Sequence, residues 1–240
     1  MSERRPRDNQ EAYVLHTYPY RETSLLLDVF ARGAGRVRLV ARGARRPRSA
    51  MRGVLLSFQL VQLGWYGKGE VRTLTRAEWI GGQPLLQGEA LLCGFYLNEL
   101  LLRLMPREDP HEALFDRYGE ALRGLASGAA TGPILRAFEK ALLREIGYAL
   151  VLERDQASGR GVDPAKTYTY DPERGPVEVG AAAQSDLRLA GKTLLDIARD
   201  DFSDAVTQQQ AKLLMRWLIN HRLEHQPLKS RRIFRELMEL

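Results

Sequence analysis

Basic and apolar residues alternate along the segment 36–42, which reads RVRLVAR. Arginine occupies positions 36, 38 and 42, whereas apolar residues occupy positions 37, 39 and 41, and only Val40 interrupts the pattern. A period of two residues is typical of a β-strand that buries one face and leaves the other toward solvent. The segment therefore predicts a strand with a basic outer face, and any fold of this chain must bury the opposite face.

Four other segments between residues 11 and 79 have the short apolar runs of strands, at residues 13–15, 24–30, 58–66 and 71–79. Gly33 and Gly35 mark the turn before the alternating strand. Several short strands in so small a region predict a closed barrel such as the OB-fold. The connection at residues 43–53 follows the alternating strand, and we expect it to form either a helix or a mobile basic loop.

Positive charge is concentrated in the same region. Eight arginines follow one another without an intervening acid, and they are Arg32, Arg36, Arg38, Arg42, Arg45, Arg46, Arg48 and Arg52. Residues 1–80 carry 15 Lys and Arg against 7 Asp and Glu, whereas residues 81–240 carry 21 against 23. Clustered arginines need an anion to neutralise them, and the planar guanidinium suits phosphate oxygens. Nucleic acid is therefore the predicted ligand, and the alternative is a solvated basic surface.

Proteins that bind single strands combine a basic groove with aromatic side chains on which bases stack. Trp65 and Tyr66 end the fourth predicted strand, so alternation turns one of them outward, and Trp65 is our stacking candidate. Lys68 follows in the next turn. The predicted DNA-binding residues are thus Arg36, Arg38, Arg42, Arg45, Arg46, Arg48, Arg52, Lys68 and Trp65.

The period changes to that of helices after Gly81-Gly82. Three helices are predicted at about residues 85–105, 110–125 and 133–147, with Asp109 as the N-cap of the second. Residues 151–192 are rich in Gly, Pro and Asp, and a hairpin is expected around the turn DPERG. Further helices are predicted at 194–197, 203–224 and 230–240. The predicted fold class is α+β multidomain, with an N-terminal OB-fold barrel at 1–80 and a helical domain at 81–240. The latter comprises a bundle at 84–148, a loop and hairpin insertion at 151–192, and C-terminal helices at 193–240.

Two basic helices are open to two interpretations. On the third helix Arg136, Lys140 and Arg144 recur every four residues, which indicates either a solvated face or a groove for an acidic, apolar peptide. The last helix, KSRRIFREL, is either a second DNA contact or a helix packed on the body, and we favour packing.

Catalysis and metal binding find little support in the sequence. The single cysteine, Cys93, excludes an internal disulfide and a cysteine-rich zinc site. His221 and His225 have no third ligand nearby, so no metal is predicted. Neither a phosphate-loop motif nor a nucleophile elbow is present. We expect a protein without enzymatic activity or cofactor. Because neither a secretory signal nor a bilayer-spanning run is visible, we also expect it to be cytoplasmic.

Several segments together resemble the bacterial RecO recombination-mediator and DNA-repair family. They are AYVLHTYPYRETSLLLDVF, GRVRLVARGARRPRS, GKGEVRTLTRAE, FYLNELLLRL, LRAFEKALLREIGY and LKSRRIFREL. The resemblance implies an N-terminal OB-fold, a central helical bundle and a C-terminal helical part. It also implies a nucleoid-associated protein that binds single- and double-stranded DNA and anneals complementary strands. Members help load RecA onto DNA covered by single-strand-binding protein (SSB), work with RecR, and bind the acidic C-terminal tail of SSB.

The resemblance also implies roles for individual residues. Arg136 matches a basic position of the family that is implicated in holding the SSB tail, and Lys140 is added because it lies on the same helix. Some members carry a four-cysteine zinc module where this chain has residues 151–164. That stretch contains no cysteine here, so we expect it to lack zinc and to be held by packing. An RNA-binding or ribosome-associated OB-fold protein and an unrecognised nuclease are the alternatives.

Overall fold

The structure is a computed structural model that describes residues 7–82, 84–179 and 187–238. The chain forms two compact units, and the first comprises residues up to 129 together with those from 228 onward. The second unit comprises residues 130–227. The predicted division at residue 80 marks a change from strands to helices, whereas the boundary between compact units falls between two of the helices.

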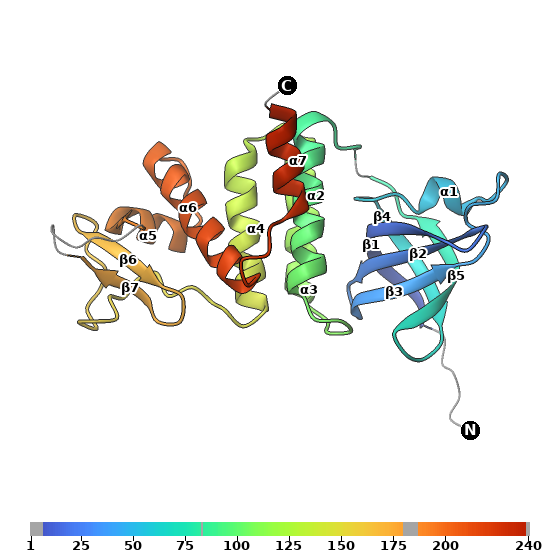
Figure 1. Cartoon of the computed structure of the whole chain (residues 1–240), viewed down its shortest axis with the longest axis horizontal. Coiled ribbons are helices and arrows are strands. Elements are labelled where there is room, and N and C mark those ends of the chain that lie inside the picture. The colour runs from blue at the N-terminus through green and yellow to red at the C-terminus, as the bar shows by residue number, and fades with distance from the viewer. Residues whose placement is uncertain (1–6, 83, 180–186, 239–240) are drawn as a thin grey trace. The chain divides into compact units, whose positions relative to one another are not determined.

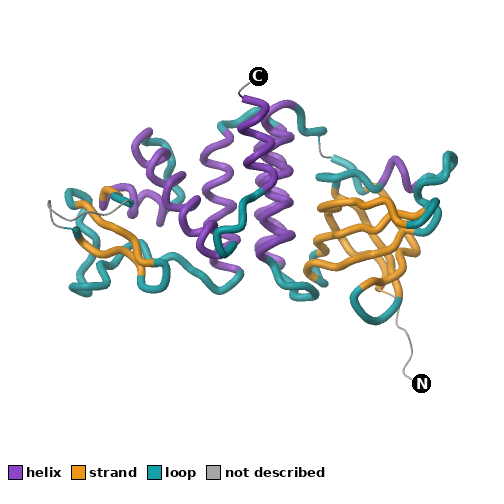
Figure 2. The backbone as a smooth tube through the Cα atoms, in the orientation of Figure 1, coloured by secondary structure: helices purple, strands orange, loops and turns teal. Residues whose placement is uncertain are grey.

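A closed five-stranded barrel begins the first unit (Figures 1 and 2). Its strands are β1 (Arg7–Tyr20), β2 (Ser24–Ala31), β3 (Gly35–Ala41), β4 (Leu60–Tyr66) and β5 (Val71–Trp79). They are ordered β1-β2-β3-β5-β4, all neighbours are antiparallel except β3 and β5, and β1 pairs with β4 to close the barrel. The predicted OB-like barrel is confirmed. Strand β1 starts at Arg7, the first of the described residues, well before the apolar run at residues 13–15 from which a strand was predicted.

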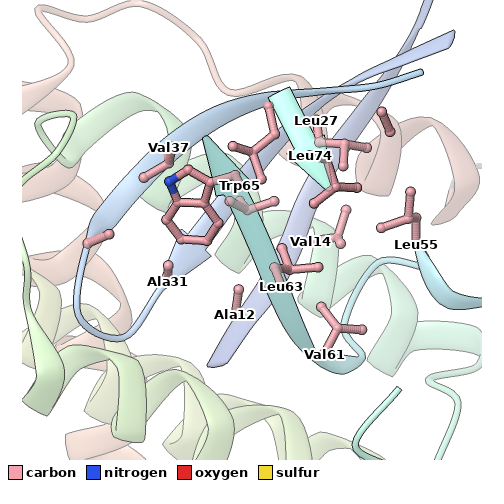
Figure 3. Packing of buried hydrophobic residues seen from close by; sticks show 14 of the residues in the cluster. Ala12, Val14, Leu27, Ala31, Val37, Leu55, Val61, Leu63, Trp65 and Leu74 are labelled. Carbon is pink, nitrogen blue, oxygen red and sulfur yellow. The ribbon is translucent and has the colours of Figure 1, made fainter. Parts of the chain in front are cut away.

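The barrel interior is filled by alternate residues of every strand. Along β3 burial alternates as predicted, with Val37, Leu39 and Ala41 inside and the even-numbered residues partly exposed. Figure 3 shows Trp65 from β4 among these aliphatic side chains. The whole cluster consists of fully or nearly fully buried apolar residues, and at about 25 cal/mol per Å² such burial is the main stabilisation of a small barrel.

The connection between β3 and β4 is a series of hydrogen-bonded turns that leads into the short helix α1 (Met51–Val54). Ala44 is fully buried, and Met51, Val54 and Leu55 pack against the barrel core. Of the two alternatives for this segment, the structure therefore has the helix, and its apolar residues hold the intervening arginines at the surface.

Helices α2 (Gly88–Leu104), α3 (Glu112–Ala126) and α7 (Lys229–Met238) complete the first unit. The N-cap prediction for α3 is wrong, because the helix begins at Glu112 with His111 at the N-cap position. Asp109 belongs instead to a segment that lies against β3, where Glu108 N–H donates to the Arg36 carbonyl at 3.0 Å. At Gly35, with φ +67°, a Cβ would lie only 2.0 Å from the Asp109 carbonyl oxygen, so this close approach requires glycine.

A β-bulge in β1 is held by the two helices that follow the barrel. Val14 pairs with Val29 and His16 pairs with Asp28, which leaves Leu15 as the extra residue. Its carbonyl accepts a hydrogen bond of 2.8 Å from Asn98 Nδ2 on α2. The Tyr118 hydroxyl of α3 donates to Asn98 Oδ1, and all three residues are almost fully buried. Helices α2 and α3 thus provide the partner that the bulge removes from the strand ladder.

Helix α7 returns to α2, as Figure 1 shows. The carboxylate of Glu99 accepts hydrogen bonds from Lys229 N–H at 2.9 Å, Ser230 N–H at 2.8 Å and the Ser230 hydroxyl at 2.6 Å. Arg231 lies over the ring of Tyr96, 5.4 Å from its centroid. A carboxylate at a helix N-terminus accepts hydrogen bonds from the free N–H groups, and its negative charge is attracted to the positive end of the helix dipole. Packing, the favoured interpretation of the last helix, is what the structure has.

The second unit combines helices with a small sheet. Its elements are α4 (Thr131–Glu145), β6 (Thr167–Asp171), β7 (Gly175–Glu178), β8 (Leu189–Ala190), α5 (Gly191–Ala198) and α6 (Ala205–Arg222). The predicted hairpin is confirmed, because β6 and β7 pair across the DPERG turn, where Asp171 Oδ1 accepts from the next backbone N–H groups. The third predicted bundle helix, α4, belongs to this unit and packs with α6.

A single carboxylate organises the loop at residues 151–164. Asp155 is 3% exposed and accepts hydrogen bonds from the Ser158 hydroxyl, from Ser158 N–H at 3.0 Å and from Glu178 N–H at 3.1 Å. These hydrogen bonds, that of Ser158 foremost, hold the pKa of Asp155 below its usual value. The loop is therefore held by polar contacts to a buried acid as well as by the expected packing.

Candidate nucleic-acid interface

The outer face of β1, β2 and β3 is composed of rows of residues set by strand register. One row crosses the sheet from His16 through Asp28 to Arg38, and the next crosses from Tyr18 through Leu26 to Val40. Residues of one row lie side by side, because directly opposed side chains in a sheet are neighbours. The predicted basic strand therefore lies beside two other strands whose outward residues are aromatic, apolar and acidic.

Arg38 is fixed by its neighbour in this row. Its Nε and NH2 groups each donate to one oxygen of Asp28 at 2.9 Å, and Asp28 is only 1% exposed. The hydrogen bond to Asp28 raises the pKa of Arg38. Such a two-pronged pair is well defined in geometry, but it cancels most of the charge that Arg38 would offer to a phosphate.

Arg36 is also engaged inside the molecule. It is half-buried, and its NH2 group donates to the Met105 carbonyl at 3.0 Å. Burial, reinforced by the nearby charge of Arg107, lowers its pKa. Arg32, the first arginine of the stretch, pairs with Glu11 at 2.8 Å and Asp116 at 2.6 Å. Three of the eight arginines therefore hold the barrel and its adjoining segments together.

The remaining arginines of the stretch lie in the connection after β3. Arg42, Arg46, Arg48 and Arg52 are exposed, and among the described residues none of them has an acidic partner. Arg45 is exposed too, and its guanidinium donates to two carbonyls of the β1–β2 turn, at 3.4 Å to Arg21 and 3.3 Å to Glu22. The free positive charge of the barrel is thus concentrated at one end of β3.

Lys68 lies toward the other end of β3. It is exposed in the β4–β5 turn, and Arg38 lies opposite Val71 in the parallel pairing of β3 with β5. Because β3 and β5 run in the same direction, Lys68, which precedes Val71, lies toward the beginning of β3. Lys68 and the connection arginines flank the outer face of β3 from opposite ends, which is an arrangement suited to a strand of nucleic acid that crosses the face.

The choice of Trp65 as the stacking residue is wrong. Its side chain is 1% exposed and points into the barrel core, as Figure 3 shows, so no base can reach it. Alternation does turn one member of the pair outward, and that member is Tyr66, which is partly exposed. The most exposed aromatic residues near the basic strand are instead Tyr18 and Tyr20, each 39% exposed.

The bulge in β1 is the reason that these tyrosines face outward. Before the bulge the residue that points away from the barrel core is Tyr13, an odd-numbered position that is buried against Phe115 and Tyr118 of α3. After the bulge the residues that point away from the core are His16, Tyr18 and Tyr20, and these are exposed. The ring of His16 lies 4.3 Å from that of Tyr18, and Arg21 lies over Tyr20 at 5.3 Å. Sequence alternation without the bulge places Tyr18 on the core side, and no residue type in the sequence signals the extra position.

The two residues expected to hold an acidic tail lie in the second unit, and both have internal partners. Arg136 is 8% exposed and pairs with the buried Glu139 at 2.7 Å. Lys140 Nζ donates to the carbonyls of Ile197 at 2.8 Å and Ala198 at 3.0 Å, and it pairs with Asp200 at 2.6 Å. Lys140 therefore caps the end of α5, whereas Arg136 is half of a buried ion pair.

Within residues 7–82, 84–179 and 187–238, no three His, Cys, Asp or Glu side chains come close enough together to bind an ion. His225 lies beyond the end of α6 with φ +60°, so it does not continue the helical face of His221. None of the described helices is long and apolar enough to cross a bilayer.

Comparison with known proteins covers nearly the whole chain. Residues 6–83 match the family model described as Recombination protein O N terminal, and residues 85–232 match Recombination protein O C terminal. A DNA repair protein RecO of Aromatoleum aromaticum is 55% identical over 100% of both chains. Those of Azoarcus sp. and Dechloromonas aromatica are 56% and 53% identical, each over 97% of both chains.

Proposed function

Because the chain belongs to the RecO family, we propose that it is a DNA repair protein that acts as a recombination mediator without catalysing a reaction. In this role it binds single- and double-stranded DNA, anneals complementary strands and helps to load RecA onto DNA covered by SSB. It works with RecR and binds the acidic tail of SSB. The family membership supports the repair role, and the outer face of the barrel supports the contact with DNA.

The observation that carries the proposal is a group of exposed arginines after β3 that have no acidic partner in the part of the chain that the structure describes. We call them the connection arginines: Arg42, Arg46, Arg48 and Arg52. They project from turns that are anchored to the barrel core by Ala44 and Leu55. Arginines held on an ordered support lose less conformational freedom on binding than those of a mobile loop. Each phosphate that they neutralise releases condensed counterions, so DNA affinity falls steeply with salt.

Annealing follows from the same charge. Two complementary strands repel one another through their phosphates, and one basic surface that binds both of them lowers this repulsion. The reaction needs no nucleotide hydrolysis, because base pairing itself provides the free energy. An annealing assay with SSB-coated complementary oligonucleotides measures this activity. If the strands anneal no faster with the protein than without it, the proposed activity is contradicted.

The contact with DNA is tested by Arg46→Ala, Arg48→Ala and Arg52→Ala combined. Arg45 is retained, since its side chain holds the β1–β2 turn. If each arginine neutralises one phosphate of a single strand, the slope of log K against log salt becomes shallower by about 2, and affinity at 0.15 M salt falls by roughly 50-fold.

A matched control removes the same charge elsewhere. Arg154, Arg160 and Arg174 are exposed residues of the second unit, and their triple alanine variant should leave the salt slope within experimental error. Equal losses in both triple variants would mean that net charge alone attracts DNA, and the connection arginines would then have no special role.

The SSB tail is proposed to meet Arg136. The tail carries acids and a terminal Phe carboxylate, and an arginine beside apolar side chains suits such a ligand. The Arg136 Nε atom is buried and has no hydrogen-bond acceptor among the described residues, so a carboxylate that reaches it would satisfy this donor. A labelled tail peptide should bind Arg136→Ala at least tenfold more weakly than Arg144→Ala, which removes an exposed arginine of the same helix. Equal affinities of the two variants would remove Arg136 from the site.

A further inference from the structure

We propose that Tyr18 and Tyr20 form a base-stacking site on the outer face of the barrel, and that this site makes the face selective for unpaired nucleobases. The inference rests on the proposed function, because it assigns a contact within a DNA-binding surface. In this site the two tyrosine rings contact unpaired bases, whereas the bases of a duplex are stacked on one another and cannot reach the rings.

Both tyrosines are accessible on the outer face of the barrel. Tyr18 and Tyr20 are each 39% exposed, although most large apolar side chains of the barrel are buried. Tyr18 lies in one row with Leu26 and Val40, both partly exposed, so its ring borders an apolar surface rather than other charges alone. A base that stacks on the ring can also cover this surface, and such stacking is tolerant of base identity.

Arginines lie close to the end of β1 that carries the two tyrosines. Tyr20 ends β1 next to the β1–β2 turn, and the backbone of this turn is bonded to Arg45, where Arg45 N–H donates to the Thr23 carbonyl at 2.8 Å. Because Arg46 follows Arg45 in the chain, the segment that carries the connection arginines lies against the turn that follows Tyr20. Arg38 lies in the row next to that of Tyr18, with β2 between their strands, and its guanidinium is held in place by Asp28. A single strand of DNA can thus stack its bases on the tyrosine rings while its neighbouring phosphates contact arginines.

The spacing of the two tyrosines along β1 differs from the spacing of stacked bases. Tyr18 and Tyr20 are two residues apart on one strand, so their side chains leave the sheet about 6.7 Å apart. Stacked bases within a duplex follow one another at about 3.4 Å along each strand, and their faces are covered. A duplex therefore offers only phosphates to this surface. An unstacked single strand can separate its bases to reach both rings, and the selectivity follows from this difference.

The bulge makes the site possible. Without the extra residue Leu15, both tyrosines would point into the core, since a shift of one residue exchanges the two faces of a strand. Asn98 and Tyr118 hold the bulge from the helices, and they are thus positioning residues for the stacking site.

The experiment measures the affinity of three probes of equal length, which are a single-stranded oligonucleotide, its abasic counterpart and the duplex. In the double variant Tyr18→Val and Tyr20→Val, the β-branched side chain retains strand propensity. We expect affinity for the single strand to fall by roughly 30-fold or more, since two stacks are lost, whereas affinities for the abasic strand and the duplex change less than twofold. The double Tyr→Phe variant keeps both rings and should keep wild-type affinity within about twofold.

The control is Tyr148→Val, which removes a similarly exposed tyrosine, 43% exposed, from the second unit. It should change none of the three affinities. An equal fall for all three probes in the double valine variant, or no fall for the single strand, would overturn the stacking site while DNA binding by the arginines stands. A wild-type protein that binds none of the probes would overturn the proposed function, and this inference with it.

Discussion

The contact between the helices and the bulge should be measurable as an energetic coupling. Asn98 donates to the carbonyl of Leu15 and accepts from the hydroxyl of Tyr118, and both partners are buried. The single variants are Asn98→Leu, which keeps the branching of the side chain, and Tyr118→Phe, which removes only the hydroxyl. In the double variant both helix positions are apolar, and only the carbonyl of Leu15 is left without its hydrogen-bond donor.

The expected magnitudes follow from which atoms lose their partner. Asn98→Leu leaves a buried carbonyl without its donor and a buried hydroxyl without this acceptor. Each loss costs about 1–3 kcal/mol, and the buried apolar side chain recovers about 1 kcal/mol, so the free energy of unfolding should fall by about 3 kcal/mol. Tyr118→Phe should cost about 1.5 kcal/mol, because it strands only the Asn98 oxygen. The double variant should cost only about 1 kcal/mol, which is less than the two single effects together, because the carbonyl of Leu15 is then the one group left without its partner.

Denaturant unfolding followed by tryptophan fluorescence provides the measurement. Trp217 lies in the second unit and Trp65 lies in the barrel core, so a Trp217→Phe background lets the fluorescence report on the barrel. This separation matters, because a chain of two compact units need not unfold in a single transition.

Additive effects, within about 0.5 kcal/mol, would refute the reasoning, since independent sites add and shared partners do not. A further expectation links stability to binding. In the folded Asn98→Leu protein the bulge loses its partner, so affinity for a single strand should fall more than affinity for a duplex. An unchanged ratio of the two affinities would show that the bulge persists without Asn98.

Three other changes have defined outcomes. Trp65→Phe should lower the free energy of unfolding by about 1–3 kcal/mol through lost burial, yet leave single-strand affinity within twofold in a binding titration. The pKa of Asp155 lies below its usual value, so its stabilisation is complete above about pH 4, the unfolded value, and is lost as the pH falls through the folded value. Melting temperatures of the wild type should therefore fall more steeply in this acidic range than those of Asp155→Asn. Lys140→Met should destabilise the second unit by about 1–3 kcal/mol in urea, because the last carbonyls of α5 lose their donor, and an unchanged midpoint would contradict the capping role.

Local patterns in the sequence predicted the elements of the fold well. The alternation at residues 36–42 has its buried and exposed faces where the sequence indicated, because a period of two is a direct property of an extended backbone. The hairpin at DPERG and the helices after residue 193 also follow from local chemistry. Asp109 shows the limit of such reasoning, since its contact with Gly35 is made across a long stretch of sequence and overrides the capping pattern.

The site was less predictable, and each difference has a physical cause. Tyr18 and Tyr20 depend on a bulge, which changes the parity of a strand without a sequence signal of its own. Arg38 and Lys140 have the residue type of a ligand contact, but their charges are used by Asp28 and by the end of α5. Which arginine remains free depends on where the acids of other strands and helices lie, and only the assembled structure provides that.

The order of the chain through the two units has a consequence for how the protein is made. Synthesis proceeds from the N-terminus, so the ribosome completes the barrel, α2 and α3, then the entire second unit, and only then the helix α7 that belongs to the first. Until Lys229 and Ser230 emerge, the Glu99 carboxylate lacks the three donors that it holds in the finished protein. A chain that ends early therefore displays an uncovered side of α2, where chaperones and proteases can distinguish incomplete molecules from complete ones.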